Sequence, residues 1–299
     1  MSIVYLNGEY LPVEAARVSV LDRGFTFGDS VYEVIPVYGE HVFRLDEHLT
    51  RLYNSLRAIN MENPRSVEQW QDIFRTVLDK NQLAADRSLY VQVTRGVSTR
   101  DHLDDQGLTA TVFVMCRPVV QRDFSLGVSA ITHEDIRWQY CHIKATTLLA
   151  NVLLKQRARK AGDAVEAILV KSGRITEGAS SNVFVVIDGV VLTPEKDGSV
   201  LPGITRDLVV ELLHHDGLAC FEKLVTLEGM RAADEVWLTS STLGIMPVVS
   251  IDGGPVADGR PGPVWQRANA LYQHFKTDPA MLKRGNIGGS GAAVRAPGL

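Results

Sequence analysis

The chain has 299 residues, of which 45% are hydrophobic and 22% are charged. This composition is typical of a globular protein of about two domains, and it excludes a disordered chain, a fibrous repeat and a disulfide-dense secreted scaffold. The 31 basic and 35 acidic residues give a formal net charge of −4, without a basic run. A surface for nucleic acid or for an anionic membrane is therefore not expected.

The chain shows no pattern of export or membrane insertion. No apolar stretch reaches the roughly 18 residues that a bilayer-spanning helix needs, and the start of the chain lacks a basic region followed by an apolar core. Cys116, Cys141 and Cys220 lie far apart without metal-ligand spacing, and we expect Cys116 in TVFVMC to be buried. These features predict a cytoplasmic protein without a metal site.

Two hairpins are predicted near the start of the chain. The Asn7-Gly8 pair, between VYL and EYL, favours a tight turn because both residues tolerate positive φ. A second hairpin joins the strand 31–38 to HVFRL. Tyr32 and Pro36 lie on one face of that strand. Since Pro36 has no N–H to donate, we expect this strand to lie at a sheet edge or to be irregular at Pro36.

Two helices and two strands follow. Apolar residues at helical spacing predict a helix in DEHLTRLYNSLRAIN, with Asp46 as N-cap and Arg51 off the apolar stripe. VEQWQDIFRTVLDKNQL predicts a second helix, and SLYVQVTRGV and LTATVFVMCRPVV predict strands joined by a polar loop. In that loop Arg100 and His102 are spaced to grip a carboxylate, although a solvated loop tip is the common alternative.

The segment VVQRDF interrupts the strand pattern after a proline and predicts a domain junction. We expect a small N-terminal domain over 1–118, an interdomain loop over 119–124, a larger domain over 125–283 and a loosely ordered tail over 284–299. The larger domain alternates strands and helices, with LGVSAITHEDIR as its first strand, TTLLANVLLKQRARKAG as its first helix and LPGITRDLVVELLHHDG as its second. Together these elements predict an α+β fold.

Lys144 differs from the other lysines of the chain. Eight of the nine lysines sit beside polar or charged residues, whereas Lys144 lies in CHIKATTLLAN at the expected start of a helix. Burial disfavours the charged amine and lowers its pKa, which suits a lysine that forms a Schiff base. A lysine that covers apolar surface with its stem and keeps its amine in water is the more common alternative.

Two segments are suited to binding an anion. Gly203 precedes Ile204 and Thr205 at a predicted helix start, where free N–H groups and the helix dipole favour negative charge. Ser241 and Thr242, in LTSSTLG, add hydroxyl groups. An ordinary helix start and a strand-end turn are the alternatives.

Glu177 lies in RITEGASSN, between a strand and a turn that contains glycine. It is either a solvated turn carboxylate, as most glutamates are, or the buried partner of a cation such as a protonated heterocycle nitrogen. The residues around it leave both interpretations open.

These segments together resemble one family. RGFTFGDSVYEVIPVY, RLDEHLTRL, EDIRWQYCHIKATTLLANVLLKQ, ITEGASSNVF, LPGITR and SSTLGIMPVV occur in the order found in fold-type IV pyridoxal-phosphate transaminases, which include D-amino-acid and branched-chain aminotransferases. The similarity runs from YLNGEYLP to IDGGPV and so covers nearly all of the chain before its last segment. It implies a small N-terminal α/β domain and a larger domain that binds pyridoxal 5'-phosphate.

The resemblance implies a role for each matching residue. Lys144 would be the Schiff-base lysine, Glu177 the acidic partner of the pyridine nitrogen, and Tyr32 a wall of the pocket. The implied cofactor contacts are Arg51, Ile204, Thr205, Ser241 and Thr242 at the phosphate, and Leu201 at the ring.

The resemblance also implies the reaction. The acidic partner keeps the ring nitrogen protonated, so that the cofactor is an electron sink, and the released lysine moves the α-proton. The implied enzyme carries an amino group from an amino acid to a 2-oxo acid by a ping-pong mechanism. Its partners would be these small molecules, with no nucleic acid and no membrane.

RGVSTRDH resembles the D-amino-acid transaminases, in which an Arg-x-His pair and the pocket tyrosine hold the substrate carboxylate. These residues would be Arg100, His102 and Tyr32, and in that subgroup the loop reaches across from a partner subunit, which implies a homodimer. The expected donors are D-alanine and D-glutamate, with 2-oxoglutarate or pyruvate as acceptor. Pro36 departs from the pattern, because well-known members have a lysine on the strand face of Tyr32.

Other functions of the same fold remain as alternatives. They are a branched-chain L-amino-acid transaminase, an (R)-amine transaminase and a 4-amino-4-deoxychorismate lyase. The lyase is disfavoured because the pair Arg100 and His102 has an immediate use for an α-carboxylate. A non-catalytic pyridoxal-phosphate-binding protein is the alternative of another class, but retention of a cofactor alone requires no carboxylate trap.

Overall fold

The computed structural model describes residues 2–81, 86–103, 107–120, 122–162 and 164–278. The tail expected over 284–299 lies outside these described residues. The architecture is α+β, as the sequence predicts. Within the described ranges, none of the helices combines the length and the apolarity that crossing a membrane requires. Cys116 is buried, as predicted.

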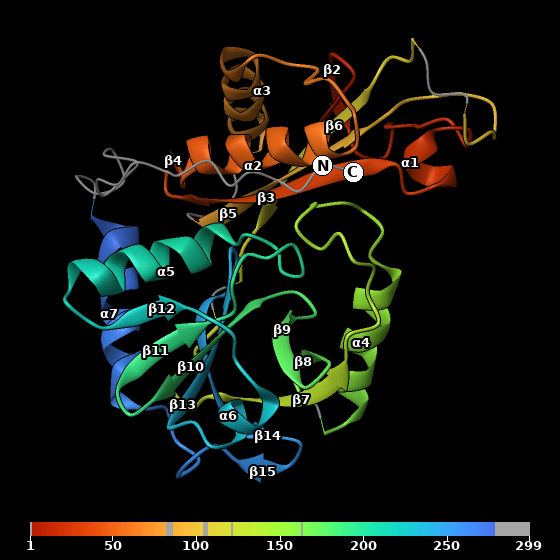
Figure 1. Cartoon of the computed structure of the whole chain (residues 1–299). Helices are drawn as coiled ribbons and strands as arrows, with labels where there is room; N and C mark the ends of the chain where they lie inside the picture. Colours follow the sequence, from red (N-terminus) through yellow and green to blue (C-terminus); the bar gives the residue numbers. More distant parts are fainter. Residues whose placement is uncertain (1, 82–85, 104–106, 121, 163, 279–299) are drawn as a thin grey trace. The chain divides into compact units, whose positions relative to one another are not determined.

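The chain divides into two compact units, each of which can be followed in Figure 1. The first comprises Met1–Gln121 and Ile143–Leu148, and the second comprises Arg122–His142 and Leu149–Leu299. The short segment Ile143–Leu148 therefore belongs to the first unit, although the sequence places it inside the second domain. This segment contains Lys144.

The first unit contains β1 (Ile3–Leu6), β2 (Glu9–Pro12), β3 (Ser30–Tyr38), β4 (His41–Val42), β5 (Asp86–Thr94), β6 (Thr111–Pro118), α1 (Arg23–Thr26), α2 (Leu45–Ala58) and α3 (Val67–Lys80). Its strands form a six-stranded antiparallel sheet in the order β2-β1-β6-β5-β3-β4 (Figure 1). Helix α2 packs on β3, and α3 packs on β1 and β6.

Both predicted hairpins are present in this unit. Strands β1 and β2 pair around Asn7 and Gly8, whose φ angles of 51° and 106° make the tight turn. Strands β3 and β4 pair around Gly39, but β4 has only two residues, so most of the outer edge of β3 is open to other partners. Pro36 lies at this edge, as predicted, and its carbonyl accepts from the Phe43 N–H at 2.9 Å.

The helix predicted in DEHLTRLYNSLRAIN is α2, but its N-cap is not Asp46. The N-cap is Arg44, whose backbone is left-handed (φ 51°, ψ 45°) and makes no side-chain cap. The prediction was wrong because the chain turns at Arg44, so that Asp46 lies in the first turn of the helix. There its negative charge interacts favourably with the positive end of the helix dipole. Helix α3 begins with a capping box made by Ser66 and Gln69.

The second unit contains β7 (Val128–Glu134), β8 (Glu166–Lys171), β9 (Arg174–Gly178), β10 (Asn182–Ile187), β11 (Val190–Thr193), β12 (Cys220–Glu222), β13 (Glu235–Ser240), β14 (Gly244–Ile251), β15 (Gly254–Pro255), α4 (Leu149–Lys160), α5 (Ile204–His215), α6 (Leu227–Arg231) and α7 (Pro263–Thr277). The sheet has nine strands in the order β12-β11-β10-β13-β14-β7-β8-β9, and β15 pairs with β14. It is mixed, because β7 is parallel to both β14 and β8.

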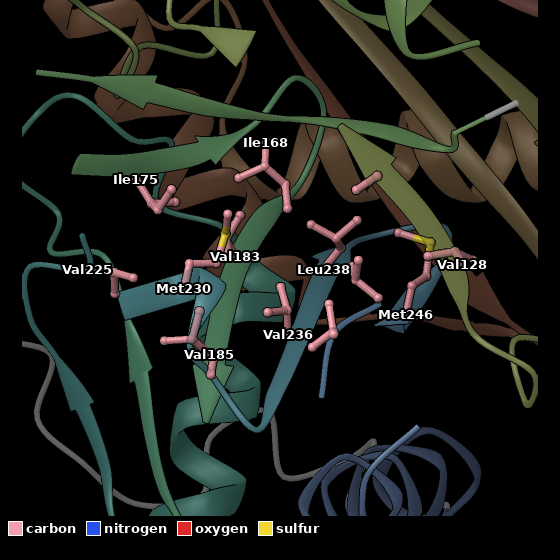
Figure 2. Packing of buried hydrophobic residues seen from close by; sticks show 14 residues of the cluster. Val128, Ile168, Ile175, Val183, Val185, Val225, Met230, Val236, Leu238 and Met246 are labelled. Carbon is pink, nitrogen blue, oxygen red and sulfur yellow. The ribbon is translucent and has the colours of Figure 1, made fainter. Parts of the chain in front are cut away.

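A buried aliphatic cluster holds the centre of this sheet. Val183 and Val185 of β10 lie opposite Leu238 and Val236 of β13, and Figure 2 shows all four side chains in the cluster with Met230 of α6. Alternation along the strands sends the neighbouring residues to the other face of the sheet. The cluster therefore fixes the strand ends of β10 and β13, which carry polar residues.

Helix α4 begins later than the sequence predicts. TTLLANVLLKQRARKAG predicts a helix from Thr146, but α4 begins at Leu149. The residues before it pair instead with β3: the Thr146 N–H donates to the Ser30 carbonyl at 3.0 Å. Lys144 is therefore not at a helix start but in an irregular segment that lies beside β3.

Candidate active site

Lys144 is held against the open edge of β3. Its carbonyl oxygen accepts from the Tyr32 N–H at 2.9 Å, and its own N–H donates to Ser55 Oγ at 3.2 Å. A bridge between Val31 and Ala145 extends the pairing. The Lys144 Nζ atom lies 4.1 Å from the centroid of the Tyr32 ring. The structure thus brings two of the predicted site residues together, with the amine over an aromatic face.

The Tyr32 ring is itself supported from the neighbouring strand. Tyr90 of β5 stacks on it, with ring centroids 5.8 Å apart and an interplanar angle of 30°. Burial raises the pKa of Tyr90 to about 12, so its hydroxyl stays protonated and donates to Gln92 Oε1 at 2.8 Å. This stacking restricts the rotation of Tyr32 and fixes the surface that the lysine amine meets.

Arg51 of α2 is buried and pairs with Glu33 of β3. Its Nε and Nη2 atoms donate to the two carboxylate oxygens of Glu33 at 2.7 and 2.8 Å. His48, one turn earlier on α2, donates from Nδ1 to Glu33 at 2.8 Å. The Glu33 side chain is fully buried, so this bidentate pair fixes the plane of the guanidinium group.

The charges of this cluster are set by burial and by contact. Burial raises the pKa of Glu33, but the charge and hydrogen bonds of Arg51 outweigh burial and hold the pKa of Glu33 well below its usual value. Burial lowers the pKa of His48 in spite of Glu33, so His48 is neutral near pH 7. Glu33 was not among the predicted site residues, although a glutamate between Val31 and Ile35 on the inner strand face is an available signal.

Glu177 is buried at the end of β9 and is not a solvated turn residue. Its side chain pairs with Arg137, and its Oε2 atom accepts from Asn182 Nδ2 at 3.0 Å and from the Leu201 N–H at 3.0 Å. Arg137 also pairs with Asp135 at 2.8 Å. Arg137 was not among the predicted site residues, and its only local signal in the sequence is the acidic pair that precedes it in EDIRW.

The Glu177 carboxyl holds its proton unusually tightly. Burial raises its pKa to about 7, against the opposing charge of Arg137 and the hydrogen bond from Leu201. Burial lowers the pKa of Arg137, but its two carboxylate partners outweigh this effect and raise it overall. Glu177 therefore titrates in the range where a change of charge can be coupled to a bound group.

The N-terminus of α5 meets the requirements of an anion site. Its N-cap is Gly203, which makes no side-chain cap, so the N–H groups of Ile204 and Thr205 begin the helix without a capping side chain. A Cβ atom at position 203 would lie 1.9 Å from Asn182 Oδ1, so only glycine fits. Ile204 and Thr205 are both buried.

The side chain of Thr239 has a buried hydroxyl group on the sheet face that also carries Asn182, the residue next to Gly203. Thr239 lies directly opposite Asn182, so both side chains project to one face of the sheet. Thr239 is 1% exposed, and its Oγ1 atom has no hydrogen-bond partner among the residues that the structure describes. Ser241 and Thr242 follow in the turn between β13 and β14. An unpaired buried hydroxyl beside an uncapped helix start fits a bound phosphate group.

Arg100 and His102 are both exposed and both lie against Phe27. The guanidinium carbon of Arg100 is 5.3 Å from the centroid of the Phe27 ring, and the His102 ring centroid is 5.1 Å from it. The contacts of Tyr32 are different, since they are with Tyr90 and Lys144. Within the first unit, the three residues expected to hold a carboxylate thus form two separate groups.

A family model described as amino-transferase class IV matches residues 30–251 of the chain. The chain belongs to the class IV aminotransferases. A D-alanine aminotransferase of Bacillus licheniformis is 41% identical over 273 residues, which cover 91% of this chain and 96% of that protein. One from Staphylococcus aureus is 36% identical over 278 residues, covering 92% and 98%. The resemblance noted from the sequence motifs is confirmed.

Solved structures of class IV aminotransferases share the fold. A branched-chain aminotransferase of Thermoproteus uzoniensis, solved with norvaline, matches with a TM-score of 0.85 and 28% identity, covering 94% of this chain and 97% of that chain. The branched-chain enzyme of Escherichia coli matches with a TM-score of 0.84 and 30% identity, covering 91% and 93%. The two-unit α+β fold is that of a fold-type IV aminotransferase.

Replacement of Arg51 will destabilise this aminotransferase. Arg51→Ala leaves the Glu33 carboxylate buried without its cation, which should lower the free energy of unfolding by about 3–5 kcal/mol. Urea unfolding measures the change. Arg57→Ala, at an exposed position of the same helix, is the control and should change it by less than about 0.5 kcal/mol. Recovery of stability in the double variant Glu33→Gln/Arg51→Ala would identify the unpaired charge as the cause, and no recovery would contradict it.

The stability of the cofactor-free protein will depend on Glu177 between pH 5 and 8. The pKa of Glu177 rises from 4.5 in the unfolded chain to about 7 in the folded protein. The protonated carboxyl therefore contributes its full share to the free energy of unfolding below pH 4.5, and this contribution is lost as the pH rises through 7. Relative to Glu177→Gln, the free energy of unfolding of the wild type should fall by about 3 kcal/mol over this pH range. Urea unfolding at each pH tests this, with the exposed Glu195→Gln as control. Parallel pH profiles for wild type and Glu177→Gln would refute the raised pKa.

Proposed function

We propose that the chain is a D-amino-acid transaminase that carries the amino group of D-alanine or D-glutamate to a 2-oxo acid such as 2-oxoglutarate or pyruvate. The observation that carries the proposal is the 41% identity to a D-alanine aminotransferase over 91% of the chain. The solved branched-chain enzymes are 28–30% identical over similar lengths. The shared fold does not separate the two substrate classes, so the higher identity favours D-amino acids.

The proposed cofactor is pyridoxal 5'-phosphate. Solved relatives are described in their pyridoxamine-phosphate and pyridoxal-phosphate forms. The uncapped start of α5 and the unpaired Thr239 hydroxyl fit its phosphate, and Ile204, Thr205, Ser241 and Thr242 are the proposed contacts there together with Arg51. When bound, the cofactor supplies a ring that withdraws electrons from the substrate α-carbon.

The chain's own groups have distinct proposed tasks. Lys144 Nζ would hold the cofactor, and the same amine would move the proton at the substrate α-carbon. Glu177 is buried and oriented by Arg137 and the Leu201 N–H, and its carboxylate would hold the proton at the pyridine nitrogen. Leu201 packs against the ring, and Tyr32 lines the pocket beside the lysine amine.

Arg100 and His102 are the proposed ligands of the substrate carboxylate. Two donors held beside one ring suit the bidentate binding of a carboxylate. In a single chain they lie with Phe27 and not with Tyr32, which supports a homodimer whose partner loop completes the carboxylate site. The loop is also flanked by exposed apolar side chains, Leu103 at 86% and Val97 at 48%, as expected of a subunit interface.

A branched-chain L-amino-acid transaminase is the second candidate. The observation in its favour is the TM-score of 0.84–0.85 to solved branched-chain enzymes.

We also propose a cytoplasmic location, which three buried cysteines without disulfide bonds support.

The first functional prediction concerns Lys144. Protein purified with pyridoxal phosphate should be yellow, and borohydride reduction should fix the cofactor to Lys144, as peptide mass spectrometry will show. Lys144→Ala should carry no fixed label, whereas Lys171→Ala, which alters an exposed lysine, should be labelled like the wild type. Recovery of the label at another lysine would refute the assignment.

The second functional prediction concerns the donor. D-alanine with 2-oxoglutarate should be turned over faster than L-leucine, measured as kcat/KM by coupled assay of pyruvate or by chromatography of the products. Arg100→Ala should lower kcat/KM for D-alanine by about 10- to 150-fold, the loss of one hydrogen bond to a charged group, without a change in the cofactor spectrum. Arg117→Ala, which alters an exposed arginine of β6, is the control. A preference for L-leucine would favour the branched-chain alternative.

A further inference from the structure

The short helix α1 carries the ring on which the Arg100 loop rests. Phe27 is the C-cap of α1, and its N–H donates to the Arg23 carbonyl. Both Arg100 and His102 contact its ring, at 5.3 and 5.1 Å. An exposed arginine samples many rotamers, and a cation over an aromatic face restricts them. The ring therefore limits the directions in which these two side chains point.

Arg23 fixes the backbone of the same loop. Its side chain is buried, and its Nη1 atom donates to the Asp101 carbonyl at 2.7 Å. Its Nη2 atom donates to the His102 carbonyl at 3.4 Å. The guanidinium carbon lies 4.8 Å from the Phe27 ring centroid. One arginine thus ties the loop backbone to the ring that orients the loop side chains.

Arg23 is in turn anchored to the body of the first unit. Its Nε atom donates to Asp29 Oδ2 at 2.9 Å, and Arg95 donates to both oxygens of Asp29 at 2.7 and 3.1 Å. Arg95 also donates to the Ile59 carbonyl at the end of α2 at 2.6 Å. Burial raises the pKa of Asp29, but the two arginines outweigh it and lower the pKa, so the carboxylate stays charged. Two ion pairs, Arg23–Asp29 and Arg95–Asp29, together with hydrogen bonds from the arginines to backbone carbonyls, therefore connect the loop to the end of α2.

We propose that Phe27, supported by Arg23, is a positioning residue that orients Arg100 and His102 for the substrate carboxylate. This inference rests on the proposed function, in which these two residues bind that carboxylate. Because the two exposed side chains are already ordered in the folded protein, less conformational entropy is lost when the substrate binds, and binding is tighter. Neither Phe27 nor Arg23 contacts the reacting atoms in this role, so their effect appears in the KM of the carboxylate substrate.

The test is Phe27→Leu, which keeps apolar bulk and removes the ring. In the holoenzyme, the KM for D-alanine should rise about 3- to 10-fold, as expected for the loss of one or two contacts with an aromatic face, with kcat and the cofactor spectrum changed less than about twofold. Phe27→Tyr, which keeps the ring, should restore the wild-type KM. The control is Phe221→Leu, at a 47% exposed residue whose ring meets Lys223 at 5.0 Å, and it should leave KM unchanged.

A double variant separates this inference from the proposed function. Because Phe27 acts partly through Arg100, Phe27→Leu should raise KM by a smaller factor in the Arg100→Ala background than in the wild type, and the remaining rise should come from His102. An equal rise in both backgrounds would overturn the positioning role, as would an unchanged KM for Phe27→Leu when Arg100→Ala raises it. If Arg100→Ala itself leaves KM unchanged, the carboxylate site of the proposed function is wrong and the inference falls with it.

A second variant covers poor folding of Phe27→Leu. Arg23→Lys keeps the charge beside Asp29 but loses the planar fork that reaches two loop carbonyls. It should raise the KM for D-alanine without lowering kcat. An unchanged KM for Arg23→Lys would overturn the role of Arg23.

Discussion

Hydrogen bonds between the segment Ile143–Leu148 and the outer edge of β3 determine the position of the lysine. A proline in β3 and a partner strand of only two residues leave this edge open, and the Tyr32 N–H donates to the Lys144 carbonyl across it. The same pairing explains why α4 begins only at Leu149. This main-chain hydrogen bond fixes the lysine backbone, and the lysine amine lies over the face of the Tyr32 ring.

Two buried glutamates show how contact geometry decides charge. Glu33 receives a bidentate arginine and a histidine, and its pKa falls well below the usual value in spite of burial. Glu177 also meets an arginine, but Arg137 is shared with Asp135, and burial prevails, so its pKa rises to about 7. The first carboxylate is a fixed charge that orients Arg51. The second is a group whose protonation responds to what binds beside it.

The class IV fold supplies a common framework, and loops distinguish its members. The relatives named D-alanine aminotransferase and the solved branched-chain enzymes match this chain over nearly the same length. Substrate choice therefore depends on a few side chains and not on the architecture. In this chain Arg23 of α1 donates both to the backbone of the loop with Arg100 and His102 and to Asp29. Contacts within the first unit therefore hold this loop in place.

The sequence by itself determined the family, the α+β class and both hairpins, because ordered motifs, strand alternation and an Asn-Gly turn are local signals. It also picked out Lys144 from the apolar residues around it. Only the tertiary structure decided that Lys144 lies beside β3, that Glu33 pairs with Arg51, and that Arg137 pairs with Glu177. Each of these depends on contacts between residues distant along the chain, and the packing of strands and helices, not local propensity, brings them together.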